Sequence, residues 1–253
     1  MESNTHLAIL SAMPEEVGTI LENLSNTESY KFGDLTIYRG FWLDKKNNRE
    51  ILISTAWSGW GKVCAARAAT RLLSLSNNLL PIDLLIFTGV AGAIKNHLNQ
   101  WDLILPTEVV QYDLDASPLF EKFEIPALKK KFLKPAAEIH SWAFQTLKNC
   151  IKTEESMSIF GNLFDGVVGT ADKFISNEKD RIKIEKDLPS IQVVEMEGAA
   201  VAQVAYQEKV PWLLLRVVSD SADKDAEINF SRFLEEYKIV SWKLIEILLE
   251  NYK

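Results

Sequence analysis

Two apolar runs place the strongest constraint on how this chain can fold. Residues 84–88 are almost wholly apolar, and residues 212–218 form a second apolar run that only Arg216 interrupts. A strand without polar alternation is covered on both faces, as the strands of parallel sheets are. Helical patterns are expected at 135–150, 178–186 and 195–207, between further short strands. This alternation predicts an α/β sandwich with a central sheet.

Shorter signals predict the remaining elements. Strands are expected at 6–11, 35–41, 50–56, 103–105, 166–169 and 192–194, and a tight turn is one interpretation of residues 88–92. Helices are expected from Glu15, over 63–74, and as a closing amphipathic helix at 230–249. Residues 116–134 predict a long irregular excursion of the kind found at functional sites or interfaces. No linker or repeat separates these segments, so we predict that residues 1–253 form a single domain.

Composition and charge exclude several classes of function. The net charge is −7, and Lys and Arg are scattered, whereas nucleic-acid binding needs a concentrated basic face. The N-terminal residues do not resemble a signal peptide, and no apolar run is long enough to span a bilayer. With only two cysteines, Cys64 and Cys150, a reducing compartment fits, and we expect a cytoplasmic protein. The three histidines are far apart in the sequence, and no metal site is expected.

Four segments place polar residues just past the end of an apolar strand, where open α/β folds bind ligands. They are residues 11–16, 88–92, 194–198 and 216–220. Ordinary structural roles are available for most of them, since Glu15 and Glu16 suit a helix N-terminus and Ser219 with Asp220 suits an N-cap. Glu195 and Glu197 are not expected to be ordinary solvent-exposed residues, because small residues that suit close packing follow them directly.

The combination of motifs resembles the 5′-methylthioadenosine/S-adenosylhomocysteine nucleosidases, which belong to the nucleoside phosphorylase superfamily. The matching stretches run in the family's order from one end of the chain to the other. They are AMPEEV at 12–17, SGWGKV at 58–63, TGVAGA at 88–93, DKFIS at 172–176, VEMEGAAVA at 194–202 and RVVSDSAD at 216–223.

This resemblance implies a single-domain three-layer α/β/α sandwich around a mixed central sheet. It implies hydrolysis of the N-glycosidic bond of an adenine nucleoside, with water as co-substrate, no cofactor, and a role in methionine salvage. A homodimer is also implied, with residues 111–121 at the contact between the subunits.

The resemblance also implies catalytic roles for individual residues. Asp220 matches the general acid that protonates the purine at N7, and Ser219 matches its orienting neighbour. Glu16 matches the residue that positions and deprotonates the attacking water. Glu197 is expected to bind the ribose 2′ and 3′ hydroxyls, where a negative charge also favours a cationic transition state. Asp220 needs a raised pKa to act as an acid near neutral pH.

The remaining substrate-binding residues are expected to surround the nucleoside. Phe174 matches the residue that stacks on adenine, and the backbone of Ile175 is expected to read the base edge. Met13, Trp60 and Met196 are expected to form an apolar wall around the ribose and the 5′ group. Without the motifs, Phe174 and Trp60 suggest ordinary core packing. Two further positions, Glu195 and Arg216, also match the family. Glu195 is expected among the substrate-binding residues, and a structural role is the alternative for both.

Three alternatives remain open at the level of the sequence. Val90 lies where many relatives carry a small hydroxyl residue, and Glu15 with Glu16 would repel phosphate, so hydrolysis is favoured over phosphorolysis. A sibling hydrolase would act on a futalosine-type compound or another adenine nucleoside. A non-catalytic nucleoside-binding relative is disfavoured because Glu16, Glu197 and Asp220 are all present.

Overall fold

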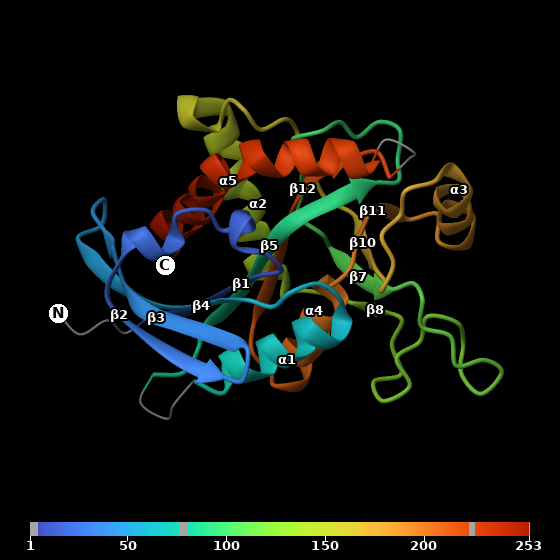
Figure 1. Cartoon of the computed structure of the whole chain (residues 1–253), viewed down its shortest axis with the longest axis horizontal. Coiled ribbons are helices and arrows are strands. Elements are labelled where there is room, and N and C mark those ends of the chain that lie inside the picture. Colours follow the sequence, from blue (N-terminus) through green and yellow to red (C-terminus); the bar gives the residue numbers. More distant parts are fainter. Residues whose placement is uncertain (1–4, 76–79, 223–225, 253) are drawn as a thin grey trace.

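The chain is described by a computed structural model covering residues 5–75, 80–222 and 226–252. Within the RVVSDSAD motif, the final residue Asp223 lies outside the described residues. The described elements form a mixed twelve-stranded sheet with helices on both faces (Figure 1).

The strand β5 (Leu84–Ala93) organises the sheet because it pairs with three neighbours. Its first half lies parallel to β1 (His6–Ser11), and it lies parallel to β12 (Trp212–Asp220) along most of its length. Its last two residues pair antiparallel with β11 (Ile191–Glu195). Three of the predicted polar strand ends are therefore brought together at the C-terminal end of β5.

The other strands extend the sheet from this centre. On one side β1 continues into β4 (Arg49–Trp57), β3 (Leu35–Asp44) and β2 (Leu24–Phe32). On the other side β11 continues into β10 (Val167–Thr170), β7 (Glu108–Gln111) and β8 (Phe132–Leu133). The short strands β6 (Leu103–Ile104) and β9 (Leu163–Phe164) extend the sheet beyond β12.

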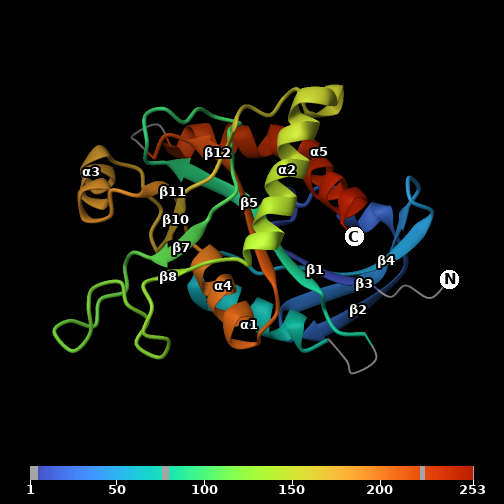
Figure 2. The same ribbon diagram turned by 180° about the vertical axis from the view of Figure 1, so that it is seen from behind.

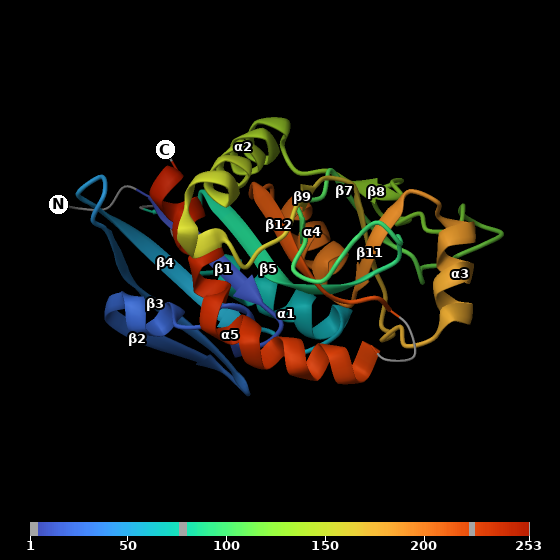
Figure 3. The same cartoon turned by 90° about the horizontal axis from the view of Figure 1, so that it is seen from above.

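The helices complete a three-layer arrangement. On one face lie α1 (Lys62–Leu73) and α4 (Gly198–Gln207), and on the other lie α2 (Ala137–Thr153) and α5 (Ala226–Asn251) (Figures 1 and 2). Near the far edge of the sheet, α3 (Glu178–Asp187) lies apart from both pairs (Figure 3). Three 3₁₀ segments complete the structure: η1 (Pro14–Glu16), η2 (Ile20–Asn23) and η3 (Glu155–Met157).

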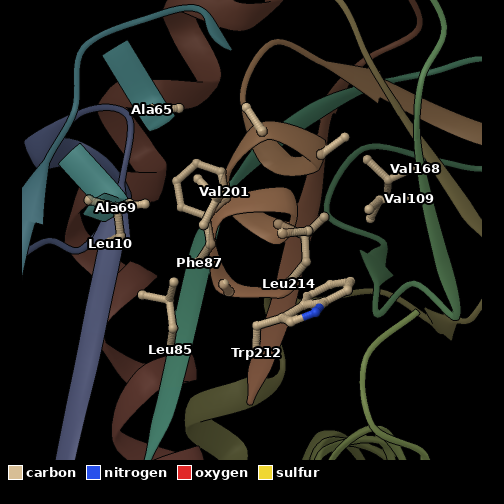
Figure 4. Packing of buried hydrophobic residues seen from close by; sticks show 14 of the residues in the cluster. Leu10, Ala65, Ala69, Leu85, Phe87, Val109, Val168, Val201, Trp212 and Leu214 are labelled. Atoms are coloured by element: carbon tan, nitrogen blue, oxygen red, sulfur yellow. The ribbon is translucent and has the colours of Figure 1, made fainter. Parts of the chain in front are cut away.

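The core consists of a buried cluster on each face of the sheet. Because side chains alternate along a strand, Trp212 and Leu214 pack with α1 and α4, while Leu213 and Leu215 pack with α2 and α5. Figure 4 shows the first cluster, in which Phe87 lies among small side chains of the two helices. The prediction of strands covered on both faces is confirmed.

Two predictions at the site edge of the sheet are wrong. The tight turn suggested for residues 88–92 is absent, because β5 continues through them and Gly92 pairs with Val194 and Asp220. The helix expected from Glu15 is replaced by η1 and η2. Between these segments, Gly18 adopts a φ of +50°, a left-handed conformation that interrupts a helix.

Other differences are smaller. The strand β2 was not predicted, because it is a mostly exposed edge strand without apolar alternation. The helix expected at 195–207 begins at Gly198, since Glu195 still belongs to β11. Residues 116–134 form the predicted irregular excursion, in which β8 is the one named strand, and it projects as green loops beyond β7 and β8 (Figures 1 and 2).

Candidate active site

The strand ends surround a single cavity. Both predicted catalytic residues and nearly all predicted binding residues line it: Met13, Glu16, Trp60, Val90, Phe174, Glu195, Met196, Glu197, Ser219 and Asp220. Ile175 lines a smaller adjoining cavity that shares Phe174, Met196 and Asp220 with the first. The structure therefore brings together residues that are more than 200 positions apart in the sequence.

Glu16 is held in a cradle of backbone N–H groups. Its Oε2 accepts hydrogen bonds from the N–H groups of Ala12 (2.8 Å) and Met13 (2.9 Å), and its Oε1 accepts one from Val90 (3.0 Å). The side chain is buried, and burial raises its pKa against the opposing influence of Arg216 and the three N–H groups. Because a carboxylate accepts about four hydrogen bonds, Oε1 keeps one position for a further donor such as water.

Gly89 allows this carboxylate to lie against β5. A Cβ atom at Gly89 would lie 2.5 Å from Glu16 Oε1 and 3.1 Å from Arg216 Nη1. The 2.5 Å contact is shorter than real Cβ atoms make, so the absence of a side chain at position 89 is a condition for the observed position of Glu16.

Glu195 has a structural environment. Its Oε2 lies 2.6 Å from Arg216 Nη2 and accepts the N–H groups of Glu197 (3.2 Å) and Gly198 (2.7 Å), while the Thr170 hydroxyl donates to its Oε1. Both partners of the ion pair are buried. The carboxylate thus holds the first N–H groups of α4, which favours the structural role over direct substrate binding.

Glu197 lies at the N-cap position of α4, but its side chain does not cap the helix. Instead, its Oε1 accepts a hydrogen bond from the N–H of Gly61 at 2.6 Å. Burial, followed by the negative charge of Glu195, raises the pKa of Glu197 to about 8. The group is therefore close to its ionisation point near neutral pH.

Asp220 ends β12 beside its predicted neighbour. The Ser219 hydroxyl donates to Asp220 Oδ2 at 2.7 Å, and the N–H of Ala222 donates to Oδ1 at 2.8 Å. Gly92 lets the carboxyl group of Asp220 lie close to β5, because a Cβ atom at position 92 would lie only 3.0 Å from Asp220 Oδ1. Ser219 is thus placed to orient the carboxyl group.

Aromatic side chains form part of the cavity wall. Phe230, near the N-terminal end of α5, lies edge-on to both Trp60 (6.1 Å between ring centres) and Phe174 (5.8 Å). Sequence reasoning missed Phe230 as a site residue. Its spacing from Phe233 and Tyr237 matches the buried stripe of α5, so no sequence signal separates it from core residues.

Comparison with known proteins identifies the family of this chain. The family model described as the phosphorylase superfamily matches residues 6–250. A 5′-methylthioadenosine/S-adenosylhomocysteine nucleosidase of Staphylococcus aureus (strain bovine RF122 / ET3-1) is 34% identical over 97% of this chain and 99% of its own length. The chain belongs to this nucleosidase family of the phosphorylase superfamily.

Solved structures of this nucleosidase family share the whole fold. The enzyme from Neisseria meningitidis, in complex with methylthio-immucillin-A, has a TM-score of 0.84 at 25% identity and covers 98% of this chain and 100% of its own. A futalosine hydrolase of Helicobacter pylori has a TM-score of 0.82 at 27% identity and covers 98% of both chains. The predicted three-layer sandwich is confirmed.

The charged residues that line the cavity bear on whether water or phosphate is the attacking group. Its described lining includes Glu16, Glu195, Glu197 and Asp220 but no Lys or Arg, and the one nearby guanidinium, of Arg216, is paired with Glu195. Glu15, the second predicted repulsive residue, does not line the cavity. Anionic phosphate would therefore enter a site dominated by carboxyl groups.

The described residues hold no group of three or more His, Cys, Asp or Glu side chains arranged to bind a metal ion. Within the same ranges, no helix has the length and apolar character needed to cross a membrane.

Proposed function

We propose that this protein hydrolyses the N-glycosidic bond of 5′-methylthioadenosine, S-adenosylhomocysteine or both, releasing adenine and the 5′-thio-ribose. The observation that carries the proposal is that Glu16, Glu197 and Asp220 open into one cavity. The names of the curated relative and of the solved neighbour support the same reaction and substrates.

Asp220 is proposed as the general acid. Adenine leaves poorly as an anion, so a proton delivered to purine N7 as the C–N bond breaks lowers the barrier. Ser219 and the N–H of Ala222 each contact one oxygen of this carboxyl and fix its orientation. Phe174 would stack on the departing base, with the backbone of Ile175 at its edge.

Glu16 is proposed to hold and deprotonate the attacking water. Its Oε1 has the acceptor position described above, and its neighbours leave it little freedom to rotate. The arrangement follows the logic of inverting glycosidases, in which an acid and a base act on opposite sides of the bond. Val90 presents its N–H to Glu16 and has no hydroxyl with which to bind phosphate.

Glu197 is proposed to bind the ribose hydroxyls and to stabilise the positive charge that develops on the sugar. Met13, Trp60 and Met196 would contact the apolar face of the ribose and the 5′ group. Phe230 adds an aromatic surface that is suited to a thioether substituent.

A sibling activity on a futalosine-type compound or another adenine nucleoside is the second candidate, and the fold of the H. pylori futalosine hydrolase supports it.

The decisive experiment offers the purified protein a panel of nucleosides, with and without phosphate, and measures the free base released. We expect adenine from 5′-methylthioadenosine without phosphate. Release only with phosphate would establish a phosphorylase, and nucleoside binding without release would establish a non-catalytic relative.

The broader setting follows from the same proposal. The protein would act as a cytoplasmic homodimer in methionine salvage, with one domain per chain and without a cofactor. The excursion at 116–134, which exposes Leu119, is suited to the subunit contact.

A further inference from the structure

A network of three charged side chains ties together the loops on either side of the cavity. Lys62, the first residue of α1, places its Nζ 2.7 Å from Asp113 Oδ1 and 3.9 Å from Asp172 Oδ2. Asp113 Oδ2 accepts the backbone N–H of Asp172 at 3.0 Å, and Asp172 Oδ1 accepts the backbone N–H of Lys62 at 2.8 Å. We call these three residues the Lys62 network.

The network is adjacent in sequence to groups of the candidate site. Gly61, whose N–H donates to Glu197, directly precedes Lys62, and Trp60 precedes Gly61. Asp172 lies two residues before Phe174. One cluster of hydrogen bonds therefore fixes the positions of a donor to Glu197 and of two aromatic side chains of the wall.

The backbone at Gly61 depends on this fit. Gly61 has a φ of +93°, and a Cβ there would lie 3.0 Å from Asp172 Oδ1. The carboxylate of Asp172 thus packs directly against the peptide that presents its N–H to Glu197. Small displacements of Asp172 would be transmitted to that hydrogen bond.

Resting on the proposed function, we propose that Lys62, Asp113 and Asp172 are positioning residues that hold the Gly61 N–H against Glu197 and so align Glu197 with the ribose hydroxyls. They touch neither the substrate nor Glu197 directly.

The direct contribution of the ion pairs to folding is small. The side chains of Lys62, Asp113 and Asp172 are 18%, 33% and 50% exposed, and exposed ion pairs contribute about 1 kcal/mol or less. A role in positioning therefore predicts changes in substrate binding that are larger than changes in stability.

The test replaces Lys62 by Met and, separately, Asp113 by Ala. Each variant is expected to raise KM for 5′-methylthioadenosine about fivefold to tenfold, as when a hydrogen bond to a charged group is weakened, with kcat changed about twofold or less. The conservative Lys62→Arg variant should keep most of the wild-type KM. Lys95→Met is the matched control, because Lys95 is 20% exposed and pairs with Glu185 at 2.8 Å on another part of the molecule.

A second readout separates positioning from long-range charge and does not depend on activity. The carboxyl ¹³C signal of Glu197, assigned by its loss in Glu197→Gln, is titrated in each variant. Losing the Gly61 N–H bond should raise the pKa of Glu197 in both Lys62→Met and Asp113→Ala. A through-space charge effect would raise it in the first variant and lower it in the second.

Wild-type KM values and an unchanged Glu197 titration in both variants would overturn the proposal, as would equal effects in Lys95→Met. If the wild-type protein releases no base, the proposed function fails, and the NMR titration still decides whether the network controls Glu197.

Discussion

The four carboxyl groups of the cavity differ in the partners that surround them. Glu195 is paired with Arg216, Glu16 is held by three N–H groups, Glu197 by one, and Asp220 by a hydroxyl and one N–H. The same functional group, a carboxyl, can thus serve as a structural anchor, a base, a sugar ligand or an acid. The surroundings of each carboxyl group set its ionisation and its orientation.

Replacing Asp220 by Asn tests the proposed acid. Asn keeps the shape of the side chain but has no proton to deliver to N7, so kcat should fall by about 10²- to 10⁴-fold. Binding of 5′-methylthioadenosine, measured by calorimetry on the variant, should change little. The control is Asp34→Asn, since Asp34 is exposed and paired with Arg67 on the surface. An unchanged kcat in Asp220→Asn would remove this role from Asp220.

Replacing Glu197 by Gln tests the raised pKa of Glu197. Burial and Glu195 raise this pKa from 4.5 to about 8, so between these values the folded protein holds a proton that the unfolded chain releases. Its contribution to the free energy of unfolding therefore decreases as pH rises through this window, by at most about 1.4 kcal/mol per pH unit.

Gln does not ionise, so urea denaturation should show Glu197→Gln gaining stability over wild type from pH 5 to pH 8, with little further gain above. A difference between the two proteins that stays constant with pH would contradict the assignment. Above pH 8, where Glu197 is ionised, the variant should also lose kcat/KM, because Gln places no negative charge next to the ribose.

At the scale of elements, the sequence predicts strands best where burial is two-sided. The strand β12 and the helix α1 match the expected 212–218 and 63–74 to within two residues, and β5 begins at the expected residue 84. The glycines of 89–92 suggest a turn locally, whereas pairing with β11 and β12 extends β5 through them. Pairing between distant strands has no signature in the local sequence. The edge strand β2 also lacks one, because it is mostly exposed and shows no apolar alternation.

The candidate site was predictable where motifs carry it. Glu16, Glu197 and Asp220 were identified from their segments, and the structure places them around one cavity. Gly61 was not singled out, because its role is exerted by a backbone N–H that meets a residue 136 positions away. Contacts that depend on the backbone conformation of a distant loop have no residue-type signature.

Replacing Gly89 by Ala tests whether β5 positions Glu16. The added methyl group would lie 2.5 Å from Glu16 Oε1, so the carboxylate must move, and a displacement of this size can lower kcat about 10²-fold. Overpacking should also cost about 1–3 kcal/mol of stability. Gly40→Ala is the matched control, since Gly40 lies on β3, away from the cavity, and its Cβ would lie 2.8 Å from the carbonyl oxygen of Ser25 on β2. Equal kcat values in the two variants would show that β5 does not position Glu16.

At the scale of the whole molecule, the sheet branches at β5, which pairs with β1, β11 and β12. This branch explains why residues from both ends of the chain line one cavity. Strand β1 delivers Glu16, β11 leads to Glu197, and β12 ends at Asp220. The buried clusters on the two faces of the sheet hold this branch rigid. The excursion at 116–134 projects away from that rigid body (Figure 2).

Replacing Leu119 by Glu tests the proposed subunit contact. Leu119 is 85% exposed on the excursion, and an apolar side chain so exposed is suited to burial against a second copy of the chain. Light scattering after size exclusion should show a dimer for wild type and a shift toward monomer for the variant. If the partner completes the substrate site, KM should rise about tenfold, equivalent to 1.4 kcal/mol.

The control variant is Ile239→Glu, at a 73% exposed position on α5, which should leave both the dimer and KM unchanged. A dimer that persists in Leu119→Glu would exclude Leu119 from the contact, and a wild-type monomer would contradict the dimer itself.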